Sequence, residues 1–145
     1  MHFATFSTPH SAPQPALVKE GRVYPLPFAD MQAVILAGAK TAAQQAINSP
    51  LLIGEGSGAR LHAPIKPTTL RDAYAFEGHV KTANQNRGRE VPEEWYQFPV
   101  FYFTNPNSIF GPDDEIPYPH YTQALDYELE IAVVIGKTGI NIKPE

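Results

Sequence analysis

Two glutamates in the stretch LDYELEIAVVIGK, residues 125–137, have side chains and a spacing that could do chemistry. Glu128 and Glu130 are two positions apart in an apolar run that is typical of a buried β-strand. Because strand side chains alternate between faces, both carboxylates would point the same way, with their Cβ atoms roughly 7 Å apart. Such a pair could share a proton, hold a cationic side chain or bind a divalent cation. The alternative is a solvated face at a sheet edge, where both glutamates are merely polar.

A second pair of reactive side chains lies upstream, in LRDAYAFEGHVKTANQN. The pattern predicts a helix over about residues 70–86, on which Asp72 and His79 would share a face, about 10.5 Å apart along the axis. The imidazole titrates in the range that suits a general base, although a lone helical histidine is often only a surface residue. Asp72 also has a simpler interpretation, because it follows Thr69 at the spacing of a capping box.

Three further motifs carry weaker indications. Arg87 follows the predicted helix and could bind a substrate carboxylate with its planar fork, or could simply be a solvated loop arginine. The glycines of residues 54–58 match neither a phosphate-binding loop nor a dinucleotide fingerprint, and they predict a turn. Residues 111–115, GPDDE, lack the alternating acidic spacing of a calcium-binding loop and also predict a turn.

The elements that must position these residues belong to a folded globular protein. The chain has 145 residues, of which 43% are hydrophobic and 18% charged, enough for one domain with a real core. A net charge of −4 gives no reason to expect a nucleic-acid partner. There are no cysteines, so any metal must be held by oxygen or imidazole ligands. The N-terminus does not resemble a signal peptide and no apolar run is long enough to span a membrane, so we expect a cytoplasmic protein.

The N-terminal part of the sequence predicts a small β unit followed by a helix. A hairpin turning at Glu20-Gly21 is expected within residues 1–28. A helix is expected over residues 31–47, where Asp30 is placed to cap the first turn. Residues 51–67 are rich in glycine and proline and predict a loop.

The rest of the sequence adds strands and loops. Residues 88–96 predict a polar loop, residues 97–110 an aromatic strand, and residues 111–119 a turn-rich connector before the Glu-x-Glu strand. Strands and helices alternate without a regular rhythm, which favours an α+β fold.

In their order and spacing, three of these stretches closely resemble the fumarylacetoacetate hydrolase family. They are LHAPIKPTTLRDAYAFEGHVKTANQNRG, FPVFYFTNPNSIFGPDDEIPYP and LDYELEIAVVIGK, and the resemblance runs from about Arg60 to Ile142. It implies a mixed β-sandwich or roll core with short flanking helices. Residues 1–60 would form a small N-terminal region, and residues 61–145 the first part of the catalytic domain.

The resemblance also implies an activity. Family enzymes act on 2-oxo or 1,3-dioxo acids, and a cytoplasmic carbon–carbon bond hydrolase of aromatic amino-acid breakdown is the first expectation. Isomerisation or decarboxylation of 2-oxo or 2-hydroxy-dienoate diacids is the alternative, and a catalytically inactive binding module is the alternative from another class. The implied cofactor is Mg²⁺, Mn²⁺ or Ca²⁺, usually in a homodimer.

By resemblance, individual residues take family roles. Glu128 and Glu130 match the Glu-x-Glu metal ligands, Asp72 an aspartate that joins the metal, and His79 the general base. Three further residues match positions that bind the substrate's carboxylate and oxygens: Tyr74, Arg87 and Tyr102.

One departure from the family pattern stands out. The third metal carboxylate of the family, in an NDWSARD-like segment, and a lysine beyond it are not in this sequence. We therefore expect an N-terminal fragment, completed by a C-terminal chain or a second subunit, which alone binds metal weakly and catalyses little. Robust hydrolysis of a dioxo acid by the 145-residue chain alone would refute this expectation.

Overall fold

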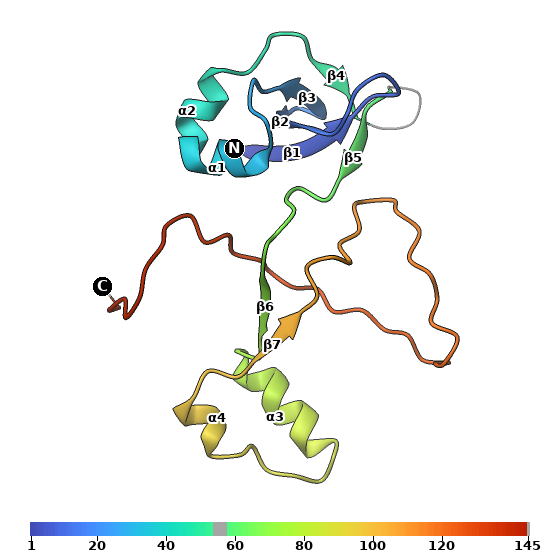
Figure 1. Ribbon diagram of the computed structural model, residues 1–145. Coiled ribbons are helices and arrows are strands. Elements are labelled where there is room, and N and C mark those ends of the chain that lie inside the picture. Colours follow the sequence, from blue (N-terminus) through green and yellow to red (C-terminus); the bar gives the residue numbers. More distant parts are fainter. Residues whose placement is uncertain (54–57, 145) are drawn as a thin grey trace. The chain divides into compact units, whose positions relative to one another are not determined.

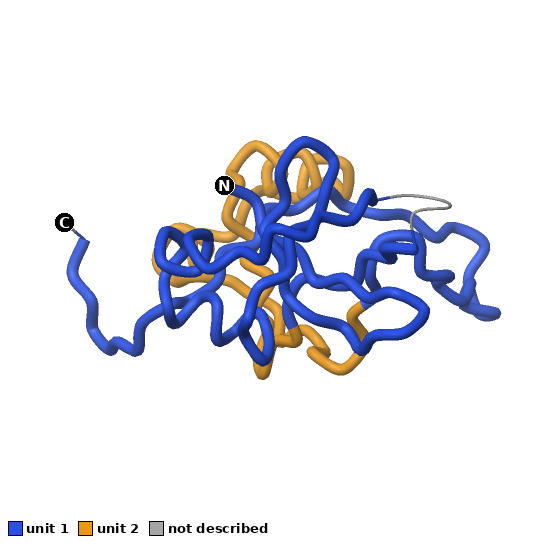
Figure 2. Tube along the Cα trace, turned by 90° about the horizontal axis from the view of Figure 1, so that it is seen from above, with its two compact units in different colours: residues 1–65, 110–145 blue, residues 66–109 orange. Residues whose placement is uncertain are grey.

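The computed structural model describes residues 1–53 and 58–144. The chain divides into two compact units, coloured separately in Figure 2. The larger unit comprises Met1–Ile65 and Phe110–Glu145, and the smaller unit comprises Lys66–Ile109. Helices and antiparallel strands are mixed in the chain, as the predicted α+β class requires. In the part of the chain that the structure describes, no helix is long and apolar enough to cross a membrane.

The larger unit is built on one antiparallel sheet of five strands in the order β4-β3-β2-β1-β5 (Figure 1). The strands are β1 (His2–Ser7), β2 (Gln14–Lys19), β3 (Arg22–Pro25), β4 (Leu51–Leu52) and β5 (Arg60–His62). Residues 51–67, predicted as a loop, thus supply two short edge strands, each paired with a distant strand of the N-terminal hairpin unit. Residues 54–57 of the predicted glycine-rich turn lie outside the described residues.

The hairpin predicted at Glu20-Gly21 is confirmed. Lys19 and Arg22 are register partners, so the two residues between them form the whole turn. Their φ angles are 52° for Glu20 and 70° for Gly21, the left-handed values that a two-residue turn requires to match the twist of its strands.

The helix predicted over residues 31–47 is two shorter helices, α1 (Met31–Ala37) and α2 (Ala39–Gln44). The predicted cap is confirmed, because Asp30 Oδ1 accepts a 2.8 Å hydrogen bond from the Ala33 N–H. Gly38, with φ of 85°, ends α1 and turns the chain into α2. An alanine-rich pattern does not reveal such a break, since only the glycine marks it.

Side chains of the sheet alternate between two apolar clusters. On one face Phe6, Ala16 and Val23 are fully buried. On the other face Phe3 and Leu17 pack against a cluster contributed mainly by the two helices: Leu26, Met31, Val34 and Ala42. The helices therefore cover one side of the sheet, as Figure 1 shows.

The smaller unit joins a two-stranded antiparallel ribbon to two helices. Its elements are β6 (Leu70–Ala73), α3 (Glu77–Gln85), α4 (Glu94–Gln97) and β7 (Phe101–Thr104). The strand predicted within residues 97–110 is confirmed as β7, whereas α4 begins within the predicted loop 88–96 and ends one residue beyond it.

The helix predicted over residues 70–86 is wrong in its first part. Leu70–Ala73 pair with β7 instead, and the helix begins only at Glu77. Asp72 therefore lies in a strand, and its proposed capping box with Thr69 does not form. Pairing with the aromatic strand outweighs the local helical pattern, because propensity is a weak prior that tertiary contacts override.

The strand predicted over residues 125–137 is also wrong in this structure. These residues form no helix or strand, and Leu129 and Ile131 are 94% and 87% exposed. A strand needs a neighbour to receive its backbone hydrogen bonds. None of the described strands pairs with this apolar segment, which we call the Glu-x-Glu segment.

Candidate functional site

Two candidate residues of the smaller unit lie directly opposite each other on the β6–β7 ribbon. Asp72 and Tyr102 are register partners, so their side chains leave the same face with Cβ atoms about 4.5–5.5 Å apart. Both residues are exposed. On the other face the Arg71 guanidinium lies 3.9 Å from the centre of the Phe103 ring, a cation–π contact. The ribbon thus presents a carboxylate and a phenol together on one face, available to a ligand.

A tight turn at Tyr74 leads from β6 towards α3. The Tyr74 N–H donates to the Val100 carbonyl at 3.0 Å, and the Ala75 N–H donates to the Ala73 carbonyl at 2.8 Å. The half-buried Tyr74 ring meets the His79 ring edge-on, with centroids 5.5 Å apart and planes at 86°. The structure therefore brings the predicted base and a predicted substrate-binding phenol into direct contact.

Helix α4 holds the neighbourhood of this pair by side-chain hydrogen bonds. The Trp95 indole N–H donates to the Tyr74 carbonyl at 2.9 Å. The Tyr96 hydroxyl donates to Glu77 Oε1 at 3.0 Å, and Lys81 Nζ pairs with the same oxygen at 2.8 Å. The sequence analysis predicts a loop here and not α4, although Pro92 and the two glutamates before Trp95 are typical of a helix start.

These contacts shift three protonation equilibria. Hydrogen bonds from Lys81 and then Tyr96 hold the pKa of Glu77 below its usual value. The same carboxylate raises the pKa of Lys81 and the pKa of Tyr96, because it accepts a hydrogen bond from each. At neutral pH Glu77 is therefore a carboxylate with two donors.

Arg87 is not brought to the histidine. It lies beyond the end of α3, where Gly88 has φ of 66° and the N–H groups of Arg87 and Arg89 both donate to the Asn84 carbonyl at 3.0 Å. Arg87 follows His79 by eight positions, about two turns of helix. Its exposed guanidinium is open to a ligand, but the structure does not join it to the Tyr74–His79 pair.

Glu128 and Glu130 belong to the larger unit, in the exposed Glu-x-Glu segment. Their carboxylates are hard oxygen donors, the kind that Mg²⁺, Mn²⁺ and Ca²⁺ prefer. The donor chemistry therefore fits a divalent cation. Among the described residues, however, no group of three or more histidine, aspartate and glutamate side chains is gathered to hold a metal.

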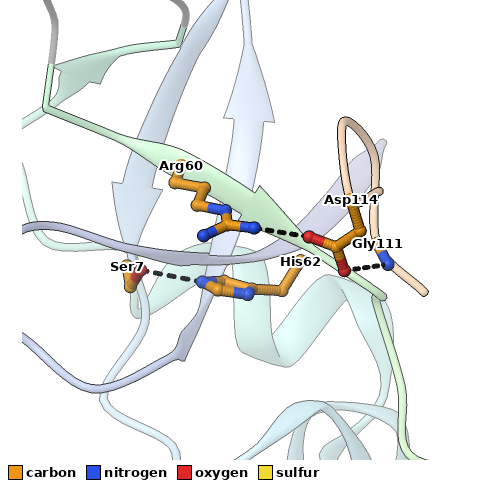
Figure 3. Close-up of polar contacts among 5 residues, drawn as sticks. All are labelled: Ser7, Arg60, His62, Gly111 and Asp114. Carbon is orange, nitrogen blue, oxygen red and sulfur yellow. Dashed lines mark hydrogen bonds and ion pairs between the residues drawn. The ribbon is translucent and has the colours of Figure 1, made fainter. Parts of the chain in front are cut away.

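The larger unit contains a polar cluster that sequence reasoning missed (Figure 3). Asp114 accepts a 2.7 Å hydrogen bond from the Gly111 N–H and forms an ion pair with Arg60 on β5. These two contacts lower the pKa of Asp114, the Gly111 N–H most and the Arg60 side chain next. Nearby, Ser7 Oγ and His62 Nε2 are 2.7 Å apart. The turn predicted at residues 111–115 is thus fastened to the sheet edge.

Gly111 approaches the backbone of β5 closely. A Cβ atom at this position would lie 2.8 Å from the Ala63 nitrogen and 2.9 Å from the His62 Cα. Only glycine fits between this turn and the strand without displacing backbone. No local pattern predicts such a contact, since the partners are about 50 residues apart in the sequence.

Comparison with known proteins defines the class of protein to which these features belong. Residues 68–145 match the family model described as fumarylacetoacetate (FAA) hydrolase C-terminal. The chain belongs to the fumarylacetoacetate hydrolase family, which confirms the resemblance found in the sequence. Members of this family are enzymes, and they commonly use divalent cations.

Particular relatives cover part of the chain. Human mitochondrial oxaloacetate tautomerase FAHD2B is 45% identical over 84 residues, which are 54% of this chain and 24% of that protein. Fumarylacetoacetate hydrolase domain-containing protein 2 of Pongo abelii is 47% identical over 80 residues, 55% of this chain and 22% of that protein. An uncharacterised Pyrococcus abyssi protein is 38% identical over 81 residues, 56% of this chain and 33% of that protein. The chain spans between a fifth and a third of the length of these relatives.

Proposed function

We propose that this chain supplies acid–base and ligand-binding residues for a metal-dependent reaction on an oxo acid, with cleavage of a carbon–carbon bond in a 1,3-dioxo acid as the first candidate. The observation that carries the proposal is the contact between Tyr74 and His79, 5.5 Å between ring centroids. It sets a proton acceptor beside a phenol that can bind a substrate oxygen. Hydrolysis consumes one water, and the products are a carboxylic acid and a shorter oxo acid.

In this proposal each side chain has one task. The His79 imidazole takes a proton from the attacking water and later returns one to the carbon released by bond cleavage. The Tyr74 and Tyr102 hydroxyls donate hydrogen bonds to substrate oxygens, and Arg87 binds the far carboxylate through its planar fork. These contacts orient the substrate so that water attacks one carbonyl only.

The proposed cofactor is a divalent cation. Glu128, Glu130 and Asp72 are the residues of this chain that would hold it. When bound, such an ion polarises a carbonyl group and stabilises the negative charge that develops on its oxygen. We propose a β-sandwich or roll as the surrounding architecture. In it, further strands of the family's fold would pair with the strands of this chain.

Tautomerisation of a 2-oxo diacid is the second candidate. It is favoured by the names of the two human relatives, both mitochondrial oxaloacetate tautomerases and both 45% identical to this chain over 84 residues. This reaction only moves a proton between carbon and oxygen, so it needs the His79 base and no attacking water. Decarboxylation of an oxo acid is the remaining variant.

The experiment compares both reactions in the natural protein that contains residues 1–145, with Mn²⁺ present. Cleavage of an acylpyruvate and enol–keto conversion of oxaloacetate are each followed by the loss of enol absorbance. His79→Gln is expected to lower the active reaction by about 10²–10⁴-fold, the usual contribution of a general base. Retention of both activities by this variant would exclude the proposed role.

The control for this experiment is His120→Gln. His120 contacts Tyr121 in a similar edge-on arrangement, with ring centroids 5.5 Å apart and planes at 81°. It therefore matches the chemistry of the Tyr74–His79 contact but belongs to the larger unit. We expect this variant to keep full activity.

A protein partner is also proposed, either a second copy in a homodimer or a complementing C-terminal chain. The support is the exposure of large apolar side chains in the Glu-x-Glu segment, among them Leu129 at 94% and Ile131 at 87%. Contiguous exposed apolar side chains are typical of a surface that binds another polypeptide. Sedimentation of the purified chain tests this, and a strictly monomeric species at high concentration would count against the homodimer.

A further inference from the structure

We propose that α4 is a positioning element for the Tyr74–His79 pair, with Trp95 and Tyr96 as its two positioning residues. The proposal rests on the proposed function for its catalytic meaning. Its structural part stands on contacts within the smaller unit alone. None of the candidate residues with a predicted role lies in α4.

Trp95 fixes the backbone of Tyr74. Its indole N–H donates to the Tyr74 carbonyl at 2.9 Å, in a part-buried contact between residues 21 positions apart. On the other side of the same residue, the Tyr74 N–H donates to the Val100 carbonyl. Both polar backbone groups of Tyr74 are therefore bound, the N–H by the residue that precedes β7 and the carbonyl by α4. A tyrosine whose backbone is fixed at both groups has a defined direction of its Cα–Cβ bond, and its ring is then confined to the few staggered rotamers.

Tyr96 fixes the start of the helix that carries the histidine. Its hydroxyl donates at 3.0 Å to Glu77, the first residue of α3 and two positions before His79. The N-cap residue of α3, Phe76, makes no side-chain capping hydrogen bond. Helix starts without such a cap fray unless other contacts hold them. The Tyr96–Glu77 bond is such a contact, and it acts on the turn of α3 that includes the imidazole.

The two aromatic residues hold each other as well. The Trp95 and Tyr96 rings meet edge-on, with centroids 4.9 Å apart and planes at 88°. Two consecutive residues of α4 thus form hydrogen bonds with the residues at both ends of the turn from β6 to α3, Tyr74 and Glu77. Because these two hydrogen bonds join α4 to Tyr74 and to Glu77, loosening either bond is expected to change the mutual orientation of the phenol and the imidazole.

The test uses Tyr96→Phe, which removes only the donating O–H, and Trp95→Phe, which removes the donating N–H together with the pyrrole part of the indole. Both variants keep an aromatic ring. Gln97→Ala is the matched control, since the Gln97 amide donates to Glu93, the N-cap residue of α4, at 3.3 Å and not to the turn between Tyr74 and Glu77. The first readout is the NMR chemical shift of the His79 Cε1–H at fixed pH, which reports the ring current of the adjacent Tyr74. We expect the shift to move in both phenylalanine variants and to stay in Gln97→Ala.

The second readout is kinetic and separates two kinds of failure. Trp95→Phe is expected to raise KM because it frees the substrate-binding Tyr74, and Tyr96→Phe to lower kcat because it frees the helix of the base, each by about three- to tenfold. An unchanged His79 shift in both phenylalanine variants would overturn the positioning role. A moved shift with both kinetic constants intact would confirm the positioning contact and contradict the proposed function of the pair.

Discussion

The N-terminal sheet and the Glu-x-Glu segment have the same kind of sequence and opposite environments. In both, apolar side chains recur along a stretch whose sequence is typical of a strand. Phe6 and Val23 of the sheet are fully buried, whereas Leu129 and Ile131 of the segment are 94% and 87% exposed. The sheet strands have antiparallel neighbours, and the segment has none among the described strands. An alternating pattern thus specifies which side chains suit burial, but pairing with other strands decides whether burial occurs.

The largest expected effect on stability comes from truncating a buried side chain of the sheet. Phe6→Ala removes a fully buried ring from the cluster that joins β1, β2 and β3, and is expected to cost about 3–5 kcal/mol of unfolding free energy. Leu129→Ala truncates an exposed side chain and is expected to change the free energy by less than about 0.5 kcal/mol. Urea unfolding of the 145-residue chain, followed by circular dichroism, measures both.

Equal costs for the two substitutions would contradict the described environments. Phe6→Leu serves as the control for the first, because it keeps most of the apolar volume and is expected to cost less than Phe6→Ala.

A smaller effect is expected where the turn at residues 111–115 meets β5. Gly111→Ala would place a Cβ atom 2.8 Å from the Ala63 nitrogen, so the turn must move, at a cost of about 1–3 kcal/mol. The matched control is Gly136→Ala in the Glu-x-Glu segment, where the new Cβ atom would meet only Ile35 Cγ2 at 3.9 Å, an ordinary contact. Urea unfolding of both variants compares them, and a neutral Gly111→Ala would rule out the close approach.

The smallest expected effect is a pH dependence at the same turn. The Gly111 N–H and the Arg60 guanidinium lower the pKa of Asp114 in the folded chain. A carboxyl group with a lowered folded pKa stabilises the fold fully above its unfolded pKa, near 3.9, and loses this contribution as the pH falls through the folded value. We therefore expect Asp114→Asn to reduce the dependence of unfolding free energy on pH below about 4.

The control for this measurement is Asp126→Asn. Asp126 accepts a local hydrogen bond at 2.8 Å from the N–H of its own neighbour, Tyr127, rather than one from a distant segment. In urea unfolding between pH 2.5 and about 6, the unfolding free energy of Asp126→Asn should depend on pH as that of the parent chain does. A parallel loss in both variants would show that the Asp114 contacts have no special part in stability.

Local features of the fold could be predicted from the sequence, and features set by distant partners could not. The Glu20-Gly21 turn and the Asp30 cap depend on residues within three positions, and both are confirmed. Asp72 was placed on a helix because its true partner, Tyr102, is 30 residues away and the local pattern favoured a helix. The break at Gly38 was missed for the opposite reason, because one glycine in an alanine-rich run carries little weight.

The candidate site shows the same division. The resemblance to the family points to Tyr74 and His79, and the structure brings the rings of these two residues together. The local pattern predicts Trp95 and Tyr96 as loop residues, because their positioning contacts are hydrogen bonds to residues about 20 positions upstream. The proposed metal ligands Asp72, Glu128 and Glu130 stay predictions, since the structure divides them between its two units.

The central claim is that the Glu-x-Glu pair binds a divalent cation, and paramagnetic Mn²⁺ tests it most directly, even for weak binding. The control pair is Asp113 and Glu115, two exposed acidic residues at the same spacing. At low Mn²⁺ concentration we predict strong broadening of the Glu128 and Glu130 amide NMR signals. This broadening should be lost in the Glu128→Gln/Glu130→Gln variant and should persist in the Asp113→Asn/Glu115→Gln variant. Broadening that survives in the first variant, or that is equally strong at residues 113 and 115 of the parent chain, would contradict the claim.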